Sequence, residues 1–417
     1  MTFRDWQELT PAAAARELHR RVITLLPPAQ QRAAIAELPS ESELAVRFAQ
    51  APAAVPLARV PCLVKDLFDV GGQPTFAGST FLPEVRPTRA TDGAFVQAVR
   101  RAGAVIAGKT HMHEFAYGIT GENAHYGNVE HPRFPGRTTG GSSSGSAAVV
   151  AAGIVPFALG SDTGGSVRLP AAFCGLYGFR LAPRGPWISD AVPLAPSYDT
   201  AGWFTANAAD LKASIAALVG LGRSDRAPRG CYLAMPGVDP DLAAACEKQA
   251  RPFAAPAEPA VRDALLQGFT SAVDTYNTVV AQEAWAYHQP WAERYQSRYS
   301  APVWQRLIRA HTLTPAQIDA AQVNTVAIRA LWERFFAAHD FLVLPASPAP
   351  ALTPSECTLE NRLRILTLTA PASIGGLPVL SVPVPLASGL TSGLQIIVNA
   401  TTSPVVRWVL ENVAAKA

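Results

Sequence analysis

Strand-length apolar runs alternate with helical patterns over the first half of the chain. Apolar residues recur at helical spacing over 11–26, 40–49, 91–103 and 144–152. Continuous apolar runs of strand length occupy 59–66, 104–108 and 154–160. Because strands that alternate with helices form sheets with helices packed on their faces, the pattern predicts an α/β fold. We expect a large mixed, mostly parallel, twisted β-sheet covered by helices on both sides.

The pattern changes in the second half of the chain. Residues 258–340 have long helical periodicity and contain Trp285, Trp291, Trp304 and Trp332. Strand-like runs return at 341–344, 379–382 and 394–398, and a helical pattern follows them. Since sheet segments stand at both ends of the sequence, we predict one domain over 1–417, with 1–50 as a helical arm. We expect 258–340 to be a helical insertion beside the substrate pocket, whose tryptophans pack helices or line that pocket.

The composition is that of a compact globular protein. Hydrophobic residues make up 49% of the chain and charged residues 16%, with a net charge of +3. No long run of like charge suggests a nucleic-acid partner. The longest apolar stretch, 147–159, is too short to span a bilayer, and Arg4, Asp5 and Glu8 stand where a secretory signal has its apolar core. We therefore expect a cytoplasmic protein with no membrane partner.

Cysteine and histidine spacing gives no metal motif. The five cysteines are widely spaced and include no C-x-x-C pair, which favours reduced thiols. His111, His113 and Glu114 form a cluster of metal-type ligands, but no companion Cys or His group offers the remaining ligands. We therefore expect no metal and no cofactor, and a structural or cleft-lining role for the two histidines.

Two glycine-serine clusters bracket a single apolar strand. The first reads Thr-Gly-Gly-Ser-Ser-Ser-Gly-Ser over 139–146, and the second reads Gly-Ser-Asp-Thr-Gly-Gly-Ser over 160–166. Glycine allows tight turns in which backbone N–H groups converge. Converging N–H groups beside a hydroxyl are what an oxyanion hole requires. One such cluster alone is usually a loop, but the pair with a buried strand between them indicates serine-based catalysis.

These clusters resemble the hallmark of the amidase signature family, a Gly-Gly-Ser-Ser cluster followed by a Thr-Gly-Gly-Ser turn. Similar motifs occur at 64–66, 108–110, 114–115 and 376–383, so the resemblance covers the chain from about residue 57 onward. It implies the fold of that family and hydrolysis of an amide carbon–nitrogen bond through an acyl-enzyme. Thr139 and Val398 depart from the proline and glycine that are usual in the family, which affects loop shape near the pocket.

The resemblance assigns roles to three side chains. Ser166 matches the nucleophile, Ser142 matches a bridging serine held on a cis peptide, and Lys65 matches the catalytic lysine. The family's oxyanion hole matches the backbone N–H groups of Thr163, Gly164, Gly165 and Ser166. Serine needs a base to become a nucleophile, and a lysine is a base only when burial keeps it neutral. We expect Lys65 to take a proton from Ser142 while Ser142 takes one from Ser166.

Further stretches narrow the substrate that the resemblance implies. Segments at 65–71, 121–127, 173–180 and 197–204 resemble the short plant-type indole-3-acetamide hydrolases. The implied substrate is a small carboxamide, of arylacetamide or indole-3-acetamide type, converted to a carboxylic acid and ammonia or an amine. Two other functions stay open, namely the amidase subunit of a tRNA-dependent amidotransferase and a non-catalytic scaffold. A homodimer, with 1–50 as a packing or dimerisation arm, is a further expectation.

Other interpretations of the same residues have less support. The segment 141–145 fits the G-x-S-x-G elbow of α/β-hydrolases, but no clear strand precedes it. The segment 162–164 resembles half of an aspartic-protease dyad without a second copy. Arg168 is either a ligand for a substrate carboxylate or, as the resemblance favours, a buried hydrogen-bond donor. We expect structural roles for Lys109 and for the serines that follow Ser142, which are Ser143 and Ser144.

Overall fold

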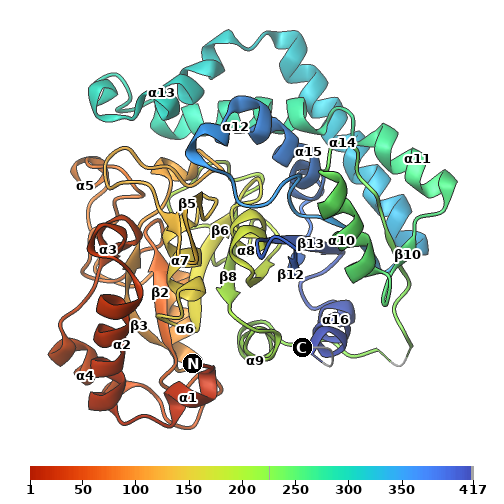
Figure 1. Ribbon diagram of the computed structural model, residues 1–417. Coiled ribbons are helices and arrows are strands. Elements are labelled where there is room, and N and C mark those ends of the chain that lie inside the picture. The colour runs from red at the N-terminus through yellow and green to blue at the C-terminus, as the bar shows by residue number, and fades with distance from the viewer. Residues whose placement is uncertain (225, 415–417) are drawn as a thin grey trace.

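The computed structural model describes residues 1–224 and 226–414, and a single large sheet crosses its centre (Figure 1). This sheet has eleven strands. In sheet order they are β1 (Ile35–Glu37), β3 (Val105–Thr110), β2 (Pro61–Lys65), β6 (Phe157–Asp162), β8 (Thr200–Thr205), β7 (Tyr177–Arg180), β12 (Val379–Pro385), β13 (Thr391–Val398), β11 (Phe341–Pro345), β9 (Gly230–Tyr232) and β10 (Ala255–Pro256). A small separate sheet pairs β4 (Glu130–His131) with β5 (Phe134–Thr138). The expected large mixed sheet is confirmed.

Parallel strands lie toward the two ends of the sheet, and antiparallel strands fill its middle. β2 is parallel to β3 and β6, and β9 is parallel to β10 and β11. The other six neighbouring pairs are antiparallel. The parallel share is therefore smaller than the strand–helix alternation suggested. Short connections such as 386–390, between β12 and β13, join neighbours as hairpins rather than through a crossover helix.

Helices cover both faces of the sheet. Those outside the 258–340 insertion are α1 (Phe3–Gln7), α2 (Pro11–Leu25), α3 (Pro28–Ala34), α4 (Glu41–Gln50), α5 (Leu82–Val85), α6 (Ala94–Arg101), α7 (Ser144–Ala151), α8 (Arg168–Cys174), α9 (Ala208–Leu218), α10 (Pro240–Ala250), α15 (Leu359–Ile374) and α16 (Pro404–Ala414). Neighbouring residues of β2 enter different hydrophobic clusters, since Leu63 packs with the cluster of Trp6 and Val64 with the cluster of Phe95. This two-sided burial explains the continuous apolar runs in the sequence.

Local signals set the helix ends that the sequence predicted. Ser40 caps α4 and forms a reciprocal capping box with Glu43. Thr10 caps α2, and a proline follows as the first helical residue. After α6 the chain turns at Gly103, where φ is +101° and a side chain would be strained.

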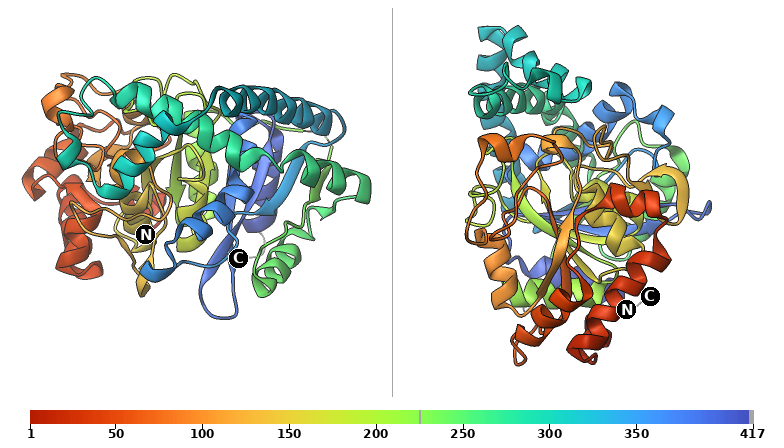
Figure 2. Two further views of the ribbon diagram at one scale, coloured as in Figure 1. Left: turned by 90° about the horizontal axis from the view of Figure 1, so that it is seen from above. Right: turned by 90° about the vertical axis from the view of Figure 1, so that its left-hand side faces the viewer.

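The helices of the insertion gather on one side of the molecule. They are α11 (Pro259–Gly268), α12 (Ala272–His288), α13 (Ala301–Ile308) and α14 (Pro315–Ala338). They lie at the top of Figure 1 and stand out from the body in the right-hand view of Figure 2. Trp332 joins α14 to α15, because its buried indole N–H donates to the carbonyl of Pro371 at 3.0 Å. Trp291 donates to the hydroxyl of Tyr299, so both tryptophans serve helix packing.

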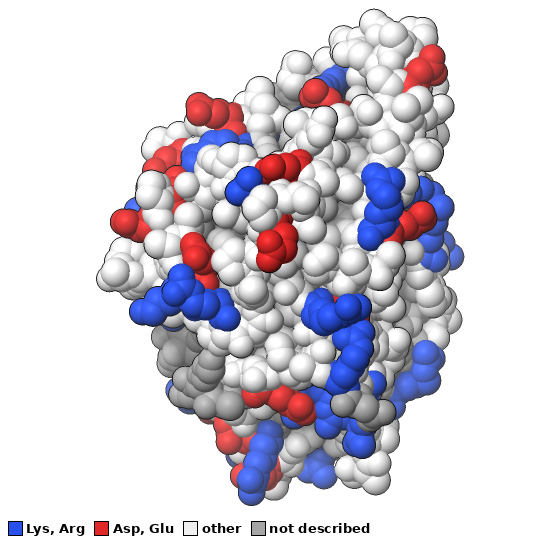
Figure 3. All heavy atoms as spheres, turned by 90° about the vertical axis from the view of Figure 1, so that its right-hand side faces the viewer, with Lys and Arg blue, Asp and Glu red and all other residues white. Residues whose placement is uncertain are grey.

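The surface carries charges of both signs. On the face shown in Figure 3, lysine and arginine side chains are interspersed with aspartate and glutamate. Within the ranges that the structure describes, no helix combines the length and the hydropathy needed to cross a bilayer.

Candidate active site

Two neighbouring parallel strands bring the predicted residues together. β2 ends at Lys65 and its neighbour β6 ends at Asp162, so both carboxyl ends open on the same edge of the sheet. The turn into α7 supplies Ser142, and the Gly141–Ser142 peptide is cis, as the family resemblance implied. Ser166 follows β6 in the turn 163–167 that leads into α8.

Lys65 is fully buried and surrounded by serine hydroxyls. Its Nζ lies within hydrogen-bond distance of Ser142 Oγ (2.7 Å), Ser161 Oγ (2.8 Å) and Ser143 Oγ (2.9 Å). The contact between Lys65 and Ser142 was expected from the sequence. The contacts to Ser143 and Ser161 were not, and the purely structural role expected for Ser143 is incomplete. Among consecutive serines nothing in the sequence distinguishes the one that faces the lysine.

The directions of these hydrogen bonds follow from a count of hydrogens. Ser143 donates its own proton to the carbonyl of Ser161 at 3.1 Å, so its oxygen accepts from Lys65. A neutral amine has two N–H donors and one lone pair, whereas an ammonium has three donors and no acceptor. With three hydroxyls around it, a neutral Lys65 must accept a proton from Ser142 or Ser161. The arrangement can therefore receive a proton without any movement of heavy atoms.

The electrostatic environment favours the neutral form of Lys65. Burial lowers the pKa of this lysine to about 7, against the opposing attraction of Asp162 and Asp199. No carboxylate lies within 4.0 Å of its amine in the described part of the chain. A lysine whose pKa is near neutrality can act as a general base.

The turn 163–167 is folded around the carboxylate of Asp162. This carboxylate accepts the backbone N–H groups of Gly165 (2.9 Å), Val167 (3.0 Å) and Arg168 (3.2 Å). Gly165 has φ of +129°, a conformation that a side chain would strain. Because Gly165 donates to Asp162, the N–H groups of Gly164 and Ser166 are the donors of this turn that have no acceptor among the described residues.

Asp162 is itself held by two arginines. Its carboxylate receives Arg168 and Arg180 at 2.8 Å each, and all three side chains are fully buried. Burial alone would raise the pKa of Asp162, but the two guanidiniums hold it well below its usual range. Arg168 is therefore a buried hydrogen-bond donor and not a substrate ligand. Asp162 and Arg180 could not be singled out from the sequence, because single charges at strand ends are common.

Ser166 is buried but has no intramolecular hydrogen bond from its side chain. It is 5% exposed, and its Oγ has no partner among the described residues. The same turn is closed from behind by Thr369 of α15, whose hydroxyl donates to the carbonyl of Gly164 at 2.6 Å. On the other side, Ile119 packs close to Gly165 and its carbonyl accepts the N–H of Gly141 at 2.7 Å.

The two histidines flank this site. The backbone N–H of His113 donates to the carbonyl of Ser142 at 3.1 Å, and the His111 ring stacks on Tyr126 at 3.9 Å. Burial lowers the pKa of His111 to about 4 and that of His113 well below its usual value, so both rings are neutral. Over 1–224 and 226–414, no three metal-type side chains meet in a way that could hold an ion. Lys109 pairs with buried Asp66 at 2.5 Å and has the structural role expected of it.

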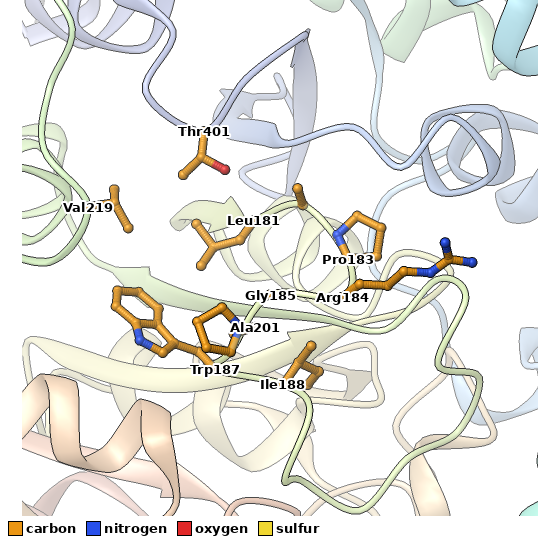
Figure 4. Close-up of a pocket in the computed structure, with 11 residues that line it drawn as sticks. Leu181, Pro183, Arg184, Gly185, Trp187, Ile188, Ala201, Val219 and Thr401 are labelled. Atoms are coloured by element: carbon orange, nitrogen blue, oxygen red, sulfur yellow. The ribbon is translucent and has the colours of Figure 1, made fainter.

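A cavity of about 340 Å³ lies elsewhere, between the end of β7 and the loop that follows it (Figure 4). Its walls include Leu181, Trp187, Ile188 and Val219, and they are mostly apolar. None of Lys65, Ser142 and Ser166 lines it. It offers no nucleophile or base, and we regard it as separate from the site.

Known proteins resemble this chain at two levels. A family model described as Amidase matches residues 29–254. Over a shorter segment the chain is 45% identical to Amidase 1 from Oryza sativa subsp. japonica across 151 residues, which are 36% of this chain and 35% of that protein. It is 42% identical to an indoleacetamide hydrolase from Pseudomonas savastanoi across 174 residues, 41% of this chain and 38% of that protein. The chain thus matches little more than a third of the length of these two relatives.

Two comparisons extend over most of the chain. A glutamyl-tRNA(Gln) amidotransferase subunit of Methanosarcina barkeri is 30% identical over 399 residues, covering 84% of this chain and 83% of that protein. A crystal structure of an amidase superposes with a TM-score of 0.86 and 28% identity, covering 100% of both chains. The chain therefore belongs to the amidase family, whose members are hydrolases that act on amide carbon–nitrogen bonds.

Proposed function

We propose that this protein hydrolyses a small carboxamide through an acyl-enzyme on Ser166, with Lys65 as the base and Ser142 as the proton relay between them. The observation that carries the proposal is the buried Lys65, whose pKa is about 7 and whose amine lies 2.7 Å from Ser142 Oγ. A neutral buried amine in contact with a serine hydroxyl is a base poised for nucleophilic catalysis.

The proposed reaction has two halves. In the first, Lys65 accepts a proton from Ser142, Ser142 accepts one from Ser166, and Ser166 Oγ attacks the amide carbonyl. The oxyanion is stabilised by backbone donors of the turn 163–166, in which the N–H groups of Gly164 and Ser166 have no acceptor among the described residues. The relay returns a proton to the leaving nitrogen as the C–N bond breaks. In the second half, water attacks the acyl-enzyme by the same route and releases the carboxylic acid.

We place the substrate among small primary amides, with ammonia as the leaving group. One relative is named for indoleacetamide, and it is 42% identical to this chain over 174 residues. Arylacetamides such as phenylacetamide and indole-3-acetamide are therefore the first compounds to examine. Anilides and carbamates belong in the same comparison, because their carbonyl groups present the same target to a serine.

A second candidate function is that of the amidase component in a tRNA-dependent amidotransferase. The similarity to the glutamyl-tRNA(Gln) amidotransferase protein of Methanosarcina barkeri extends over 83% of its length, further than the match to the hydrolases. A component of this kind passes ammonia to a partner instead of releasing it. Free ammonia produced by this chain alone would separate the two functions.

The test is a release assay for ammonia with the purified chain. We expect wild-type protein to release ammonia from at least one primary amide, and Ser166→Ala and Lys65→Ala to reduce turnover by about 10³-fold or more. Ser144→Ala is the matched control, because the buried Ser144 hydroxyl has no hydrogen-bond partner in the described part of the chain. A fluorophosphonate should label wild-type protein at Ser166. Unlabelled protein without turnover would favour the non-catalytic scaffold, and near-normal activity of the lysine variant would contradict the relay.

A further inference from the structure

Three arginines come together beside the site without any acidic partner. They are Arg306 on α13, Arg309 directly after it, and Arg362 on the first turn of α15. None of them has a carboxylate within 4.0 Å among the residues that the structure describes. By contrast, Arg364 on the same helix pairs with Asp239 at 2.9 Å. Arg306 and Arg362 are half-buried, and because such arginines are normally paired, this cluster lacks an anion that would neutralise it.

Arg306 touches the relay side of the site. Its Nη1 donates to the carbonyl of Tyr117 and lies 3.3 Å from Nε2 of His113. Since a guanidinium can only donate, Nε2 of His113 is the acceptor. The backbone N–H of the same histidine donates to the carbonyl of Ser142 at 3.1 Å. One residue therefore separates the guanidinium from the proposed relay serine.

Arg362 approaches the opposite side, beside the oxyanion turn. It lies seven residues before Thr369 on α15, which places both side chains on one helix face about 10 Å apart along the axis. Thr369 contacts the carbonyl of Gly164. The hydroxyl of Tyr276 also lies against Gly164, and the charge of Arg362 acts on this phenol. Arg362 is thus within the length of a short substrate of the turn that carries Ser166.

The electrostatics agree with an unfilled anion site. Burial, together with the charge of Arg362, lowers the pKa of Arg306 to about 10. Burial lowers the pKa of Arg362 too, and Arg309 adds to the effect against the opposing influence of Tyr276 and Tyr117. A bound anion would relieve both the desolvation and the repulsion between these cations.

We propose that Arg306 and Arg362 bind a carboxylate on the substrate, so that the preferred substrate is the monoamide of a short dicarboxylic acid. The inference rests on the proposed amide hydrolysis and narrows its substrate class. A planar guanidinium matches a carboxylate with two parallel hydrogen bonds, which fixes the far end of the substrate. The amide end then lies at Ser166, and hydrolysis with one water yields a dicarboxylate and ammonia.

The first experiment compares substrates with and without the carboxylate. It measures kcat/KM for succinamate, glutaramate and adipamate against butanamide, pentanamide, hexanamide and indole-3-acetamide. We expect wild-type protein to prefer at least one acidic monoamide over its neutral counterpart by about tenfold or more. Arg362→Gln should lower that ratio by about 10- to 100-fold, and Arg362→Lys should lower it less, because a charge remains but the fork is lost. Arg364→Gln should keep the wild-type ratio.

A binding measurement keeps the anion site testable without turnover. Glutarate should raise the Tm of wild-type and Arg364→Gln protein, and this shift should be lost in Arg362→Gln. If no amide is hydrolysed but the Tm shift behaves as expected, the proposed hydrolysis fails and the anion site stands. Equal hydrolysis of acidic and neutral amides, with a ratio unchanged by Arg362→Gln and no Tm shift, would overturn the inference and leave the hydrolase intact.

Discussion

Lys65 and Lys109 are both buried lysines at strand ends, yet their surroundings give them different chemistry. Lys109 forms an ion pair with Asp66 at 2.5 Å, which keeps its charge compensated. Lys65 has only hydroxyl groups within hydrogen-bond distance, so burial dominates and brings its pKa to about 7. An apolar strand ending in a lysine is compatible with either environment. The partner decides whether the residue is structural or a base.

The pH profile of activity reports the charge of Lys65. The proposed base acts only when neutral, so kcat/KM should rise as pH increases through about 7 and level off above it. The measurement is kcat/KM for one primary amide from pH 5.5 to 9. A profile that falls over this range would contradict the assignment of Lys65 as a base.

Ser143→Ala should change both the rate and the position of this profile. Ser143 accepts a hydrogen bond from Lys65, and such a bond is stronger when the lysine is charged. Its loss therefore disfavours the ammonium, and the midpoint of the profile should move below the wild-type value. We expect kcat to fall by about tenfold, since one of the three contacts that orient the amine is gone. Ser144→Ala should leave both the rate and the midpoint unchanged, and equal effects of the two substitutions would contradict this view.

Much of the site could be predicted at the residue scale, and the limits are physical. Lys65 and Ser142 stand in recognisable motifs, and they are in contact in the structure as expected. Ser143 and Ser161 could not be assigned, because a serine beside another serine has the same local pattern whichever way it faces. The roles of Arg306 and Arg362 depend on contacts between segments more than 180 residues apart, such as Tyr117 with Arg306. No local pattern carries that information.

At the scale of elements, the turn between β6 and α8 is shaped by groups that do not take part in the proposed chemistry. Arg168 reaches the carbonyl of Thr369 at 2.7 Å and the side chain of Gln395 at 2.9 Å. The turn is thereby connected to α15 and β13. Strands such as β2, β6 and β13 were predicted because they are apolar throughout. β8 was not, because Gly202 interrupts it where a side chain would collide with the backbone of β7.

Asp162→Asn should destabilise the protein strongly. It removes the charge that compensates Arg168 and Arg180, and both guanidiniums are fully buried. Leaving buried charges unpaired costs about 3–5 kcal/mol of the free energy of unfolding, which urea unfolding can measure. The control is Asp340→Asn, which breaks the more exposed pair with Arg226 and should cost about 1 kcal/mol or less. Equal losses for the two variants would show that the Asp162 pairs are not special.

At the scale of the whole molecule, neutral buried histidines limit stability in acid. The ring of His131 lies 3.1 Å from the carbonyl of Phe173 through Nε2, and its Nδ1 accepts the N–H of Arg133 at 3.1 Å. The ring must be neutral to accept that bond. Burial, followed by the charge of Arg133, lowers its pKa to about 4, and burial lowers that of His288 to about 3.

The expected result is a Tm that falls between pH 6.5 and 4. In this window the unfolded chain binds a proton at His131 and the folded protein does not, so the free energy of unfolding decreases as pH falls. Each such group contributes at most about 1.4 kcal/mol per pH unit. His131→Gln, which can still donate and accept, should show a shallower slope of Tm against pH. A slope equal to that of wild type would exclude His131 as a contributor.

The links from Arg168 to Thr369, Ser373 and Gln395 have a consequence for biosynthesis. A nascent chain carries the lysine and both serines soon after its first 170 residues leave the ribosome, but α15 and β13 emerge about 200 residues later. Until then the two buried arginines lack half of their partners, and the turn that holds Ser166 has nothing behind it. The proposed nucleophile is therefore assembled only near the end of translation, so an unfinished chain is inert.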